Sequence, residues 1–184
     1  NLIWGYGWDG FNGYGRFTDI TTDQNANVYV SGLFTGTIDF NPLPGGGANY
    51  NIKTSVGAQD ICLIKMSSSG LAKRVKVTGS TGDDALRSIA LSEDRTLYAS
   101  GNFSNTVDIN WGPGVNNITS TSLTDAFVMK LDTALNFKWV KPYGGLNDDM
   151  PFQLRRYDSL LVIAGSYYNN IDLNPSATST AIHT

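Results

Sequence analysis

A five-residue motif occurs three times along the chain and constrains its fold more than any other feature. The motif holds an Asp followed two residues later by an Asn, and it occupies residues 37–41, 106–110 and 170–174. Its aspartates, Asp39, Asp108 and Asp172, are separated by offsets of 69 and 64. A fixed long period is the mark of a repeat architecture. The sequence therefore predicts a unit of roughly 65 residues, copied nearly three times.

Other segments recur in the same order around the motif. Residues 28–32 match 97–101 and, more loosely, 161–165, and residues 60–66 match 125–131. The start of the chain reads as the tail of an earlier unit, with Trp4 in the place of Trp139. We therefore expect four parts: 1–11 as the last strand and loop of a preceding blade, 12–79 and 80–145 as blades, and 146–184 as an incomplete blade.

Each unit contains four short apolar stretches separated by turn signals such as Ser67-Ser68-Ser69-Gly70. No window of a dozen residues has convincing helical periodicity. The third stretch is apolar at both parities, as in residues 61–64, which is expected of a strand in a sheet packed between two others. Four short antiparallel strands per unit, repeated radially, describe a β-propeller blade. The predicted fold is all-β, a partial β-propeller of four-stranded antiparallel blades.

The chain resembles a known family at these residues. The run from Ile20 to Gly32, the following Thr-Ile-Asp-Phe-Asn-Pro segment (37–42) and then Asp60-Ile-x-Leu-x-Lys65 look like the SBBP-type bacterial β-propeller repeat. The resemblance covers nearly the whole chain. Two departures are Trp111 in place of the motif proline and a shortened first hairpin in the third copy. The resemblance implies an exported, often surface-exposed bacterial protein, but no single activity.

Propellers close with about four to eight blades, more than this chain supplies. Left alone, its end sheets would expose apolar faces and unpaired strand edges. We therefore expect the remaining blades to come from missing sequence or from other chains.

Strand parity assigns the loops to two faces. In such a blade, the loop leading into the first strand and the connection between the second and third strands emerge together, opposite the two tight hairpins. We call the face that carries the entry loop and the connection between the second and third strands the long-loop face. Binding is expected on this face. Its predicted acids are Asp9, Asp39, Asp83, Asp84, Asp108, Asp148, Asp149 and Asp172.

The repeated Asp motif has two interpretations. Carboxylate and amide oxygens two residues apart in an extended segment point the same way, and Ca²⁺ takes six to eight oxygen ligands. The alternative is that Asp accepts backbone N–H bonds and Asn starts an Asx turn. The candidate metal residues are Asp39, Asn41, Asp108, Asn110, Asp172 and Asn174.

Signals for catalysis are poor. The single histidine, His183, gives little support to a Ser-His-Asp or Cys-His arrangement. The pairs Asp83-Asp84 and Asp148-Asp149 suggest a carboxylate glycosidase. Adjacent residues in an extended chain point apart, however, and the pairs recur with the unit, which favours a structural role. We predict no catalytic residues and no cofactor other than the Ca²⁺ considered above.

Trp8 and Trp111 have no equivalents in the other units and lie in long-face loops. Each is a candidate for stacking on a sugar ring or anchoring a protein contact, or else covers the core beneath its loop.

Composition is consistent with export. Charged residues are 16% of the chain, and the net charge of −3 argues against nucleic acid or an anionic membrane surface as partner. No stretch is long enough for a membrane-spanning helix, so no membrane insertion is expected. We predict a secreted or cell-surface location. The single cysteine, Cys62, is expected to be a buried free thiol.

Two functions follow. The first is a non-catalytic binding or scaffold module of an exported bacterial protein, which contacts a protein or glycan through the long-loop face. The alternative is a fragment of a propeller enzyme, such as a carbohydrate-active one, with its catalytic groups outside this chain.

Overall fold

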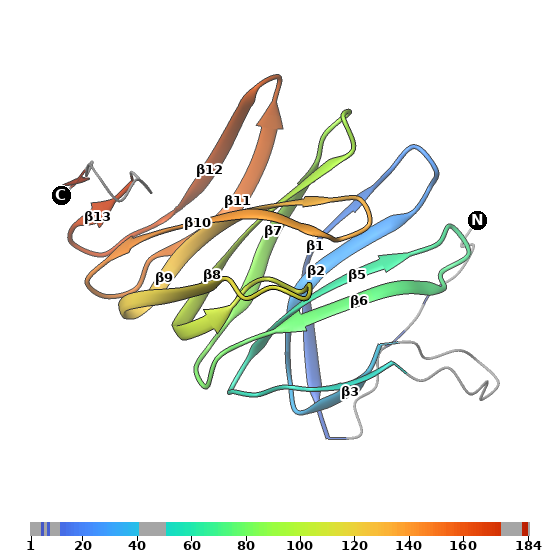
Figure 1. Cartoon of the computed structure of the whole chain (residues 1–184), viewed down its shortest axis with the longest axis horizontal. Coiled ribbons are helices and arrows are strands. Elements are labelled where there is room, and N and C mark those ends of the chain that lie inside the picture. The colour runs from blue at the N-terminus through green and yellow to red at the C-terminus, as the bar shows by residue number, and fades with distance from the viewer. Residues whose placement is uncertain (1–4, 6, 8–11, 41–50, 174–181, 184) are drawn as a thin grey trace.

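The computed structural model in Figure 1 describes residues 5, 7, 12–40, 51–173 and 182–183. Those residues contain strands and no helix, and every pairing between named strands is antiparallel. The all-β prediction is therefore confirmed. With no helix among the described residues, none of them forms a candidate membrane-spanning helix. Trp4, Trp8, Asp9, Asn41 and Asn174 lie outside the described residues.

The first sheet has four strands in the order β1-β2-β5-β6. Its strands are β1 (Tyr14–Thr22), β2 (Val28–Thr35), β5 (Asp60–Met66) and β6 (Ala72–Thr78). A separate two-stranded ribbon, β3 (Thr37–Asp39) with β4 (Ile52–Thr54), interrupts the connection from β2 to β5.

The second sheet repeats this order and extends it. Its first four strands are β7 (Ala85–Leu91), β8 (Thr96–Asp108), β9 (Asn117–Asp132) and β10 (Phe137–Gly145). Strands β8 and β9 are long because they include the counterpart of the β3–β4 ribbon, where residues 106–108 pair with 117–119.

The second sheet has six strands, not the expected four, because β13 (Ile171–Asp172) pairs with the end of β10 and β14 (Ile182–His183) pairs with β13. A glycine makes this possible. Gly145 lies opposite Ile171, and a Cβ added at Gly145 would lie 2.0 Å from the carbonyl oxygen of Asn170. Only a residue without a side chain allows that approach.

The third sheet is a hairpin of β11 (Met150–Tyr157) and β12 (Leu160–Ser166). Within the described residues, β12 pairs only with β11. In Figure 1 the β1–β2, β7–β8 and β11–β12 turns extend to the top of the view. Strand β3 lies at the opposite end of the β1–β2 hairpin, and β13 lies at the opposite end of the β11–β12 hairpin.

The same backbone irregularities occur in all three segments. The first hairpin of each segment, which is β1–β2, β7–β8 or β11–β12, turns at a residue with positive φ: Ala26 (55°), Arg95 (62°) and Asp158 (50°). A second positive-φ residue precedes each Asp motif: Gly36 (69°), Asn105 (55°) and Asn169 (60°). Each first strand also carries a bulge, at residues 18, 87 and 152. Bulges and left-handed residues fix where a strand bends, so the three segments share one local geometry.

The core lies on both faces of the first sheet. Ile61 and Leu63 of β5 belong to a cluster with Phe103 and Phe127 of the second sheet. Cys62 and Ile64 belong to a second cluster with Val28, Val30, Phe34, Ile38, Phe40 and Met66. The third strand is thus buried on two faces, as its unbroken apolar sequence predicts.

Cys62 provides a test of this packing. Its side chain is fully buried and the thiol is free, as predicted, and burial raises its pKa well above the ordinary range. Because the thiolate is the reactive form, we expect a bulky aromatic disulfide reagent to label native protein at least a hundredfold more slowly than protein in urea. Equal labelling rates would contradict the burial of Cys62.

Candidate functional site

The Asp motif is built around a carboxylate that accepts backbone hydrogen bonds. The Oδ1 atom of Asp108 accepts the N–H groups of Asn110 and Asn116 at 3.0 and 2.9 Å. The Oδ1 atom of Asn110 in turn accepts the N–H of Gly112 at 2.9 Å, as in an Asx turn. Oδ1 of Asp39 accepts the N–H of Asn51 at 2.9 Å. These contacts support the loop-forming interpretation of the motif.

The three motifs occupy separate elements and are not brought together into one site. Asp39 lies on β3, Asp108 at the end of β8 and Asp172 on β13. No group of three or more His, Cys, Asp or Glu side chains with metal-binding geometry occurs among the described residues. Calcium binding by Asp39, Asn41, Asp108, Asn110, Asp172 and Asn174 stays a prediction.

Substitution of Asp108 distinguishes the two interpretations. We expect Asp108→Ala to lower the free energy of unfolding by about 1–3 kcal/mol, because two backbone N–H groups lose their acceptor. Thermal melts in millimolar Ca²⁺ and in excess chelator should show the same loss. If Ca²⁺ instead raises the melting temperature of the wild type but not of Asp108→Ala, the motif is a metal site.

Two other aspartates lie where the first sheet meets the second. Asp60 begins β5 and its carboxylate accepts the N–H groups of Val56 and Gly57, at 2.8 and 3.1 Å. Asp84, which precedes β7 and is fully buried, accepts the N–H groups of Ser80 and Ser104. Between them, residues 59 and 83 form a parallel bridge. The two carboxylates are near enough that the charge of Asp60 raises the pKa of Asp84, although burial is the larger cause.

The same joint recurs between the second and third sheets. Asp125 and Asp149 stand where Asp60 and Asp84 stood, and residues 124 and 148 form the parallel bridge. Asp125 accepts the N–H of Thr121 at 2.9 Å, and Asp149 accepts that of Gly145 at 2.7 Å. Burial raises the pKa of both aspartates. We call each arrangement an aspartate joint.

The second joint is less complete than the first. Oδ1 of Asp125, Oδ1 of Asp149 and the hydroxyl of Tyr143 are buried and have no hydrogen-bond partner among the described residues. Burial raises the pKa of Asp149 more than the backbone N–H groups of Gly145 and Tyr168 lower it. Burial, followed by the charge of Asp149, raises the pKa of Tyr143.

The joints explain the Asp-Asp pairs without catalysis. In each pair the second residue, Asp84 or Asp149, is fully buried and bound to backbone, while Asp83 is exposed. The proximity of Asp60 to Asp84 was not predicted from the sequence. A signal was present, since Asp60 and Asp84 are 24 residues apart and so are Asp125 and Asp149.

Trp111 covers the core and is only partly exposed. Its ring packs against the cluster that contains Phe103 and Val107, and its buried indole N–H has no partner in the part of the chain that the structure describes. The backbone carbonyl oxygen of Trp111 accepts a hydrogen bond from the ammonium group of Lys76, on the first sheet, at 2.8 Å. This placement favours the core-covering interpretation over that of a free stacking platform. Trp8, the other candidate, lies outside the described residues.

Large apolar side chains are exposed on the long-loop face, whose described residues are 36–40, 51–59, 79–84, 104–124, 144–149 and 167–173. Val115 is 75% exposed, beyond the end of β8. Val56 and Leu146 lie in two other connections and are similarly exposed. The full set on this face is Ile52, Val56, Val115, Leu123, Leu146, Tyr167, Tyr168 and Leu173. Several segments of this face thus expose large apolar side chains to solvent.

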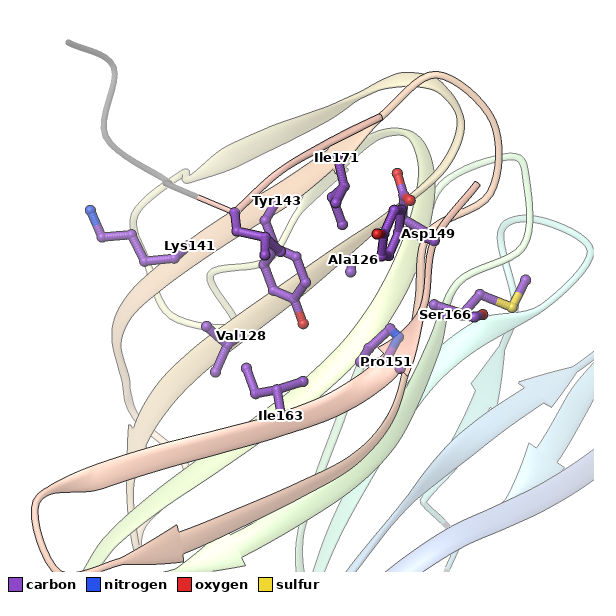
Figure 2. Close-up of a pocket in the computed structure, with 13 residues that line it drawn as sticks. Ala126, Val128, Lys141, Tyr143, Asp149, Pro151, Ile163, Ser166 and Ile171 are labelled. Atoms are coloured by element: carbon purple, nitrogen blue, oxygen red, sulfur yellow. The ribbon is translucent and has the colours of Figure 1, made fainter. Parts of the chain in front are cut away.

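A cavity of about 340 Å³ lies between the second sheet and the β11–β12 hairpin. Figure 2 shows Val128 and Tyr143 of the second sheet lining it, with Pro151 and Ile163 contributed by the hairpin. Its wall is mostly apolar, and the carboxylate of Asp149 lies at one end.

No protein-family model matches the chain. A stretch of 128 residues, 70% of this chain, is 26% identical to the regulatory protein FlaEY of Caulobacter vibrioides. That stretch spans 13% of the length of FlaEY, so the similarity concerns a small part of a much longer protein.

Proposed function

We propose that the chain is a section of a β-propeller and serves as a non-catalytic binding or scaffold module of an exported bacterial protein. It contacts a partner protein or a glycan through the long-loop face. The observation that carries the proposal is the series of exposed apolar side chains on that face, among them Val56, Val115 and Leu146. Exposed apolar side chains gathered on one face mark interaction sites more often than isolated ones do.

The propeller interpretation rests on the order of the strands and on the joints. The first two sheets have the strand orders β1-β2-β5-β6 and β7-β8-β9-β10, and each contacts the next through an aspartate joint. Shared bulges and positive-φ residues in the third hairpin extend the pattern. Radial repetition of such sheets is how propellers protect their strand edges. The SBBP-like motifs support the same architecture.

Export to the cell surface is supported by the low content of charged residues and by the resemblance to SBBP-type repeats. Remaining blades would come from further polypeptide. Nucleic acid and membrane insertion are not part of the proposal. The enzyme-fragment alternative draws no support from the aspartate pairs, because Asp84 and Asp149 are engaged by backbone N–H groups.

Site-specific photo-cross-linking tests the binding face. A photoreactive amino acid at Val115 is expected to give adducts with bacterial envelope proteins or to label glycans retained from an array. The matched control is the same amino acid at Leu71, which is exposed in the β5–β6 hairpin at the other end of the first sheet. We expect at least a tenfold higher adduct yield from position 115. Equal yields from both positions would refute the long-loop face as the binding surface.

A further inference from the structure

Strand β12 has an exposed edge where its counterparts are covered. In the second sheet the equivalent strand, β8, pairs with β7 on one side and with β9 on the other. Leu97, Ala99 and Ser100 of β8 are fully buried. Their counterparts in β12, by sequence offset, are Leu161 and Ile163, which are half-buried, and Ala164, which is exposed, and the neighbouring Val162 is 53% exposed. The difference arises because, within the described residues, β12 has β11 as its only neighbour.

The cavity beside β12 corresponds to a filled space in the preceding joint. Its lining residues Ala126, Val128, Ile163, Tyr167 and Ile171 are the counterparts, by sequence offset, of a set of core residues. That set is Ile61, Leu63, Ala99, Phe103 and Val107, all in the cluster between the first and second sheets.

Side chains of β9 fill that space in the preceding joint. Phe127 lies opposite Gly101, and its ring packs edge-on against Phe103 with centroids 6.0 Å apart. A Cβ added at Gly101 would lie 2.7 Å from the Phe127 ring, so the ring occupies the space that a side chain there would need. Met129 lies opposite Ala99 in the same cluster. The cavity therefore lacks the counterparts of Phe127 and Met129.

We propose that the edge of β12 and the adjoining cavity form a docking site for one β-strand of the kind seen in β5 and β9. Such a strand contains an Asp followed by four apolar residues, at 60–64 in β5 and at 125–129 in β9. This inference rests on the blade architecture proposed above and adds the identity and register of the strand that the third segment accepts. Addition of a strand to an exposed edge is an established mode of peptide recognition, in which side-chain pockets supply the specificity.

The register follows from the second sheet. Because Gly101 pairs with Phe127 and Ala99 with Met129, Gly165 should pair with a large apolar residue and Ile163 with the apolar residue two positions later. Their side chains would enter the cavity, toward Ala126 and Val128. The Asp of the docked strand would lie opposite Tyr167, as Asp125 lies opposite Phe103.

A second copy of the described chain does not supply this strand. Both of its Asp-headed strands, β5 and β9, are already paired on two sides. The occupant is therefore a strand from polypeptide outside the described residues, a further unit of the same kind.

A peptide corresponding to residues 121–143 serves as the probe, since it contains the Asp-headed part of β9 together with β10 as far as Tyr143. We expect the fluorescently labelled peptide to bind the 184-residue chain with a micromolar Kd, measured by fluorescence anisotropy. The same peptide with Phe127→Asp should bind at least tenfold more weakly, because a carboxylate would enter an apolar cavity. Equal affinity of the two peptides, or no binding of either, overturns the proposal.

Two protein variants locate the site. Ile163→Glu places a charge in the cavity wall and should weaken peptide binding at least tenfold, whereas Val162→Glu, on the adjacent and exposed residue, should change it less than threefold. Circular dichroism checks that both variants fold. If the chain forms dimers that Ile163→Glu abolishes, a second copy covers the edge and the proposal is wrong. Cross-linking from Val115 probes the long-loop face and does not depend on the edge of β12. A peptide that fails to bind would therefore overturn the strand-docking proposal without overturning the proposal that the long-loop face binds a partner.

Discussion

Replacing Phe127 by Ala should lower the free energy of unfolding by about 3–5 kcal/mol, the range for truncating a buried aromatic side chain in a core. Phe127 is fully buried and belongs to the cluster that joins the first and second sheets. The loss combines the transfer of the ring to water with the cavity left between two sheets. Small domains have a stability of about 5–15 kcal/mol, so the change is a large fraction of the total.

Urea denaturation followed by tryptophan fluorescence measures the effect of Phe127→Ala. Tyr157→Ala is the matched control, because Tyr157 is 76% exposed at the β11–β12 turn and its truncation should change stability by less than about 0.5 kcal/mol. A loss below about 1 kcal/mol for Phe127→Ala would mean that the two sheets do not share this core.

Asp84→Ala should be nearly as damaging, with an expected loss of about 2–5 kcal/mol. The side chain is fully buried and accepts the backbone N–H groups of Ser80 and Ser104. Each donor left without a partner costs about 1–3 kcal/mol. The neighbouring Asp83 is exposed, so Asp83→Ala is the control and should be close to neutral. Equal effects of the two substitutions would refute the structural role of the aspartate joint.

The pH dependence of Asp84 has a defined sign. Burial, together with the charge of Asp60, raises the pKa of Asp84 in the folded protein. A raised folded-state pKa means that protonated Asp84 contributes stability below the unfolded value of about 3.9, and this contribution is lost as pH rises through the folded value.

The stability of the wild type relative to Asp84→Asn should therefore fall between pH 4 and pH 7. Denaturation midpoints of both proteins across this range test the sign, and the comparison removes the effects of the other titrating groups. A relative stability that rises with pH would show that the backbone donors hold Asp84 in its charged form.

Much of the fold could be predicted from the sequence because local chemistry determines it. Unbroken apolar runs such as 61–64 predicted strands buried on two faces, and the structure places Ile61 and Cys62 in different clusters. Turn residues marked the hairpins: the segment Ser67-Ser68-Ser69-Gly70 predicted a turn, and it connects β5 to β6 with a positive φ at Gly70 (84°). These features depend on residues close together in the chain.

The parts that could not be predicted depend on contacts between distant residues. The addition of β13 to β10 requires the backbone of Asn170 to approach Gly145, which neither segment indicates alone. The meeting of Asp60 with Asp84 depends on how one sheet stacks on the next. Trp111 had two open interpretations, and its packing against the core was decided by the neighbouring sheet.

Amide hydrogen exchange, measured by mass spectrometry on the 184-residue chain, tests whether the three segments share one strand arrangement in which β12, unlike β2 and β8, pairs on one side only within the described residues. We expect strong protection in β2 and β8, which are paired on both sides, and exchange at least tenfold faster in β12. Protection of β12 equal to that of β8 would show that a second strand covers its edge in this chain and would contradict the shared arrangement.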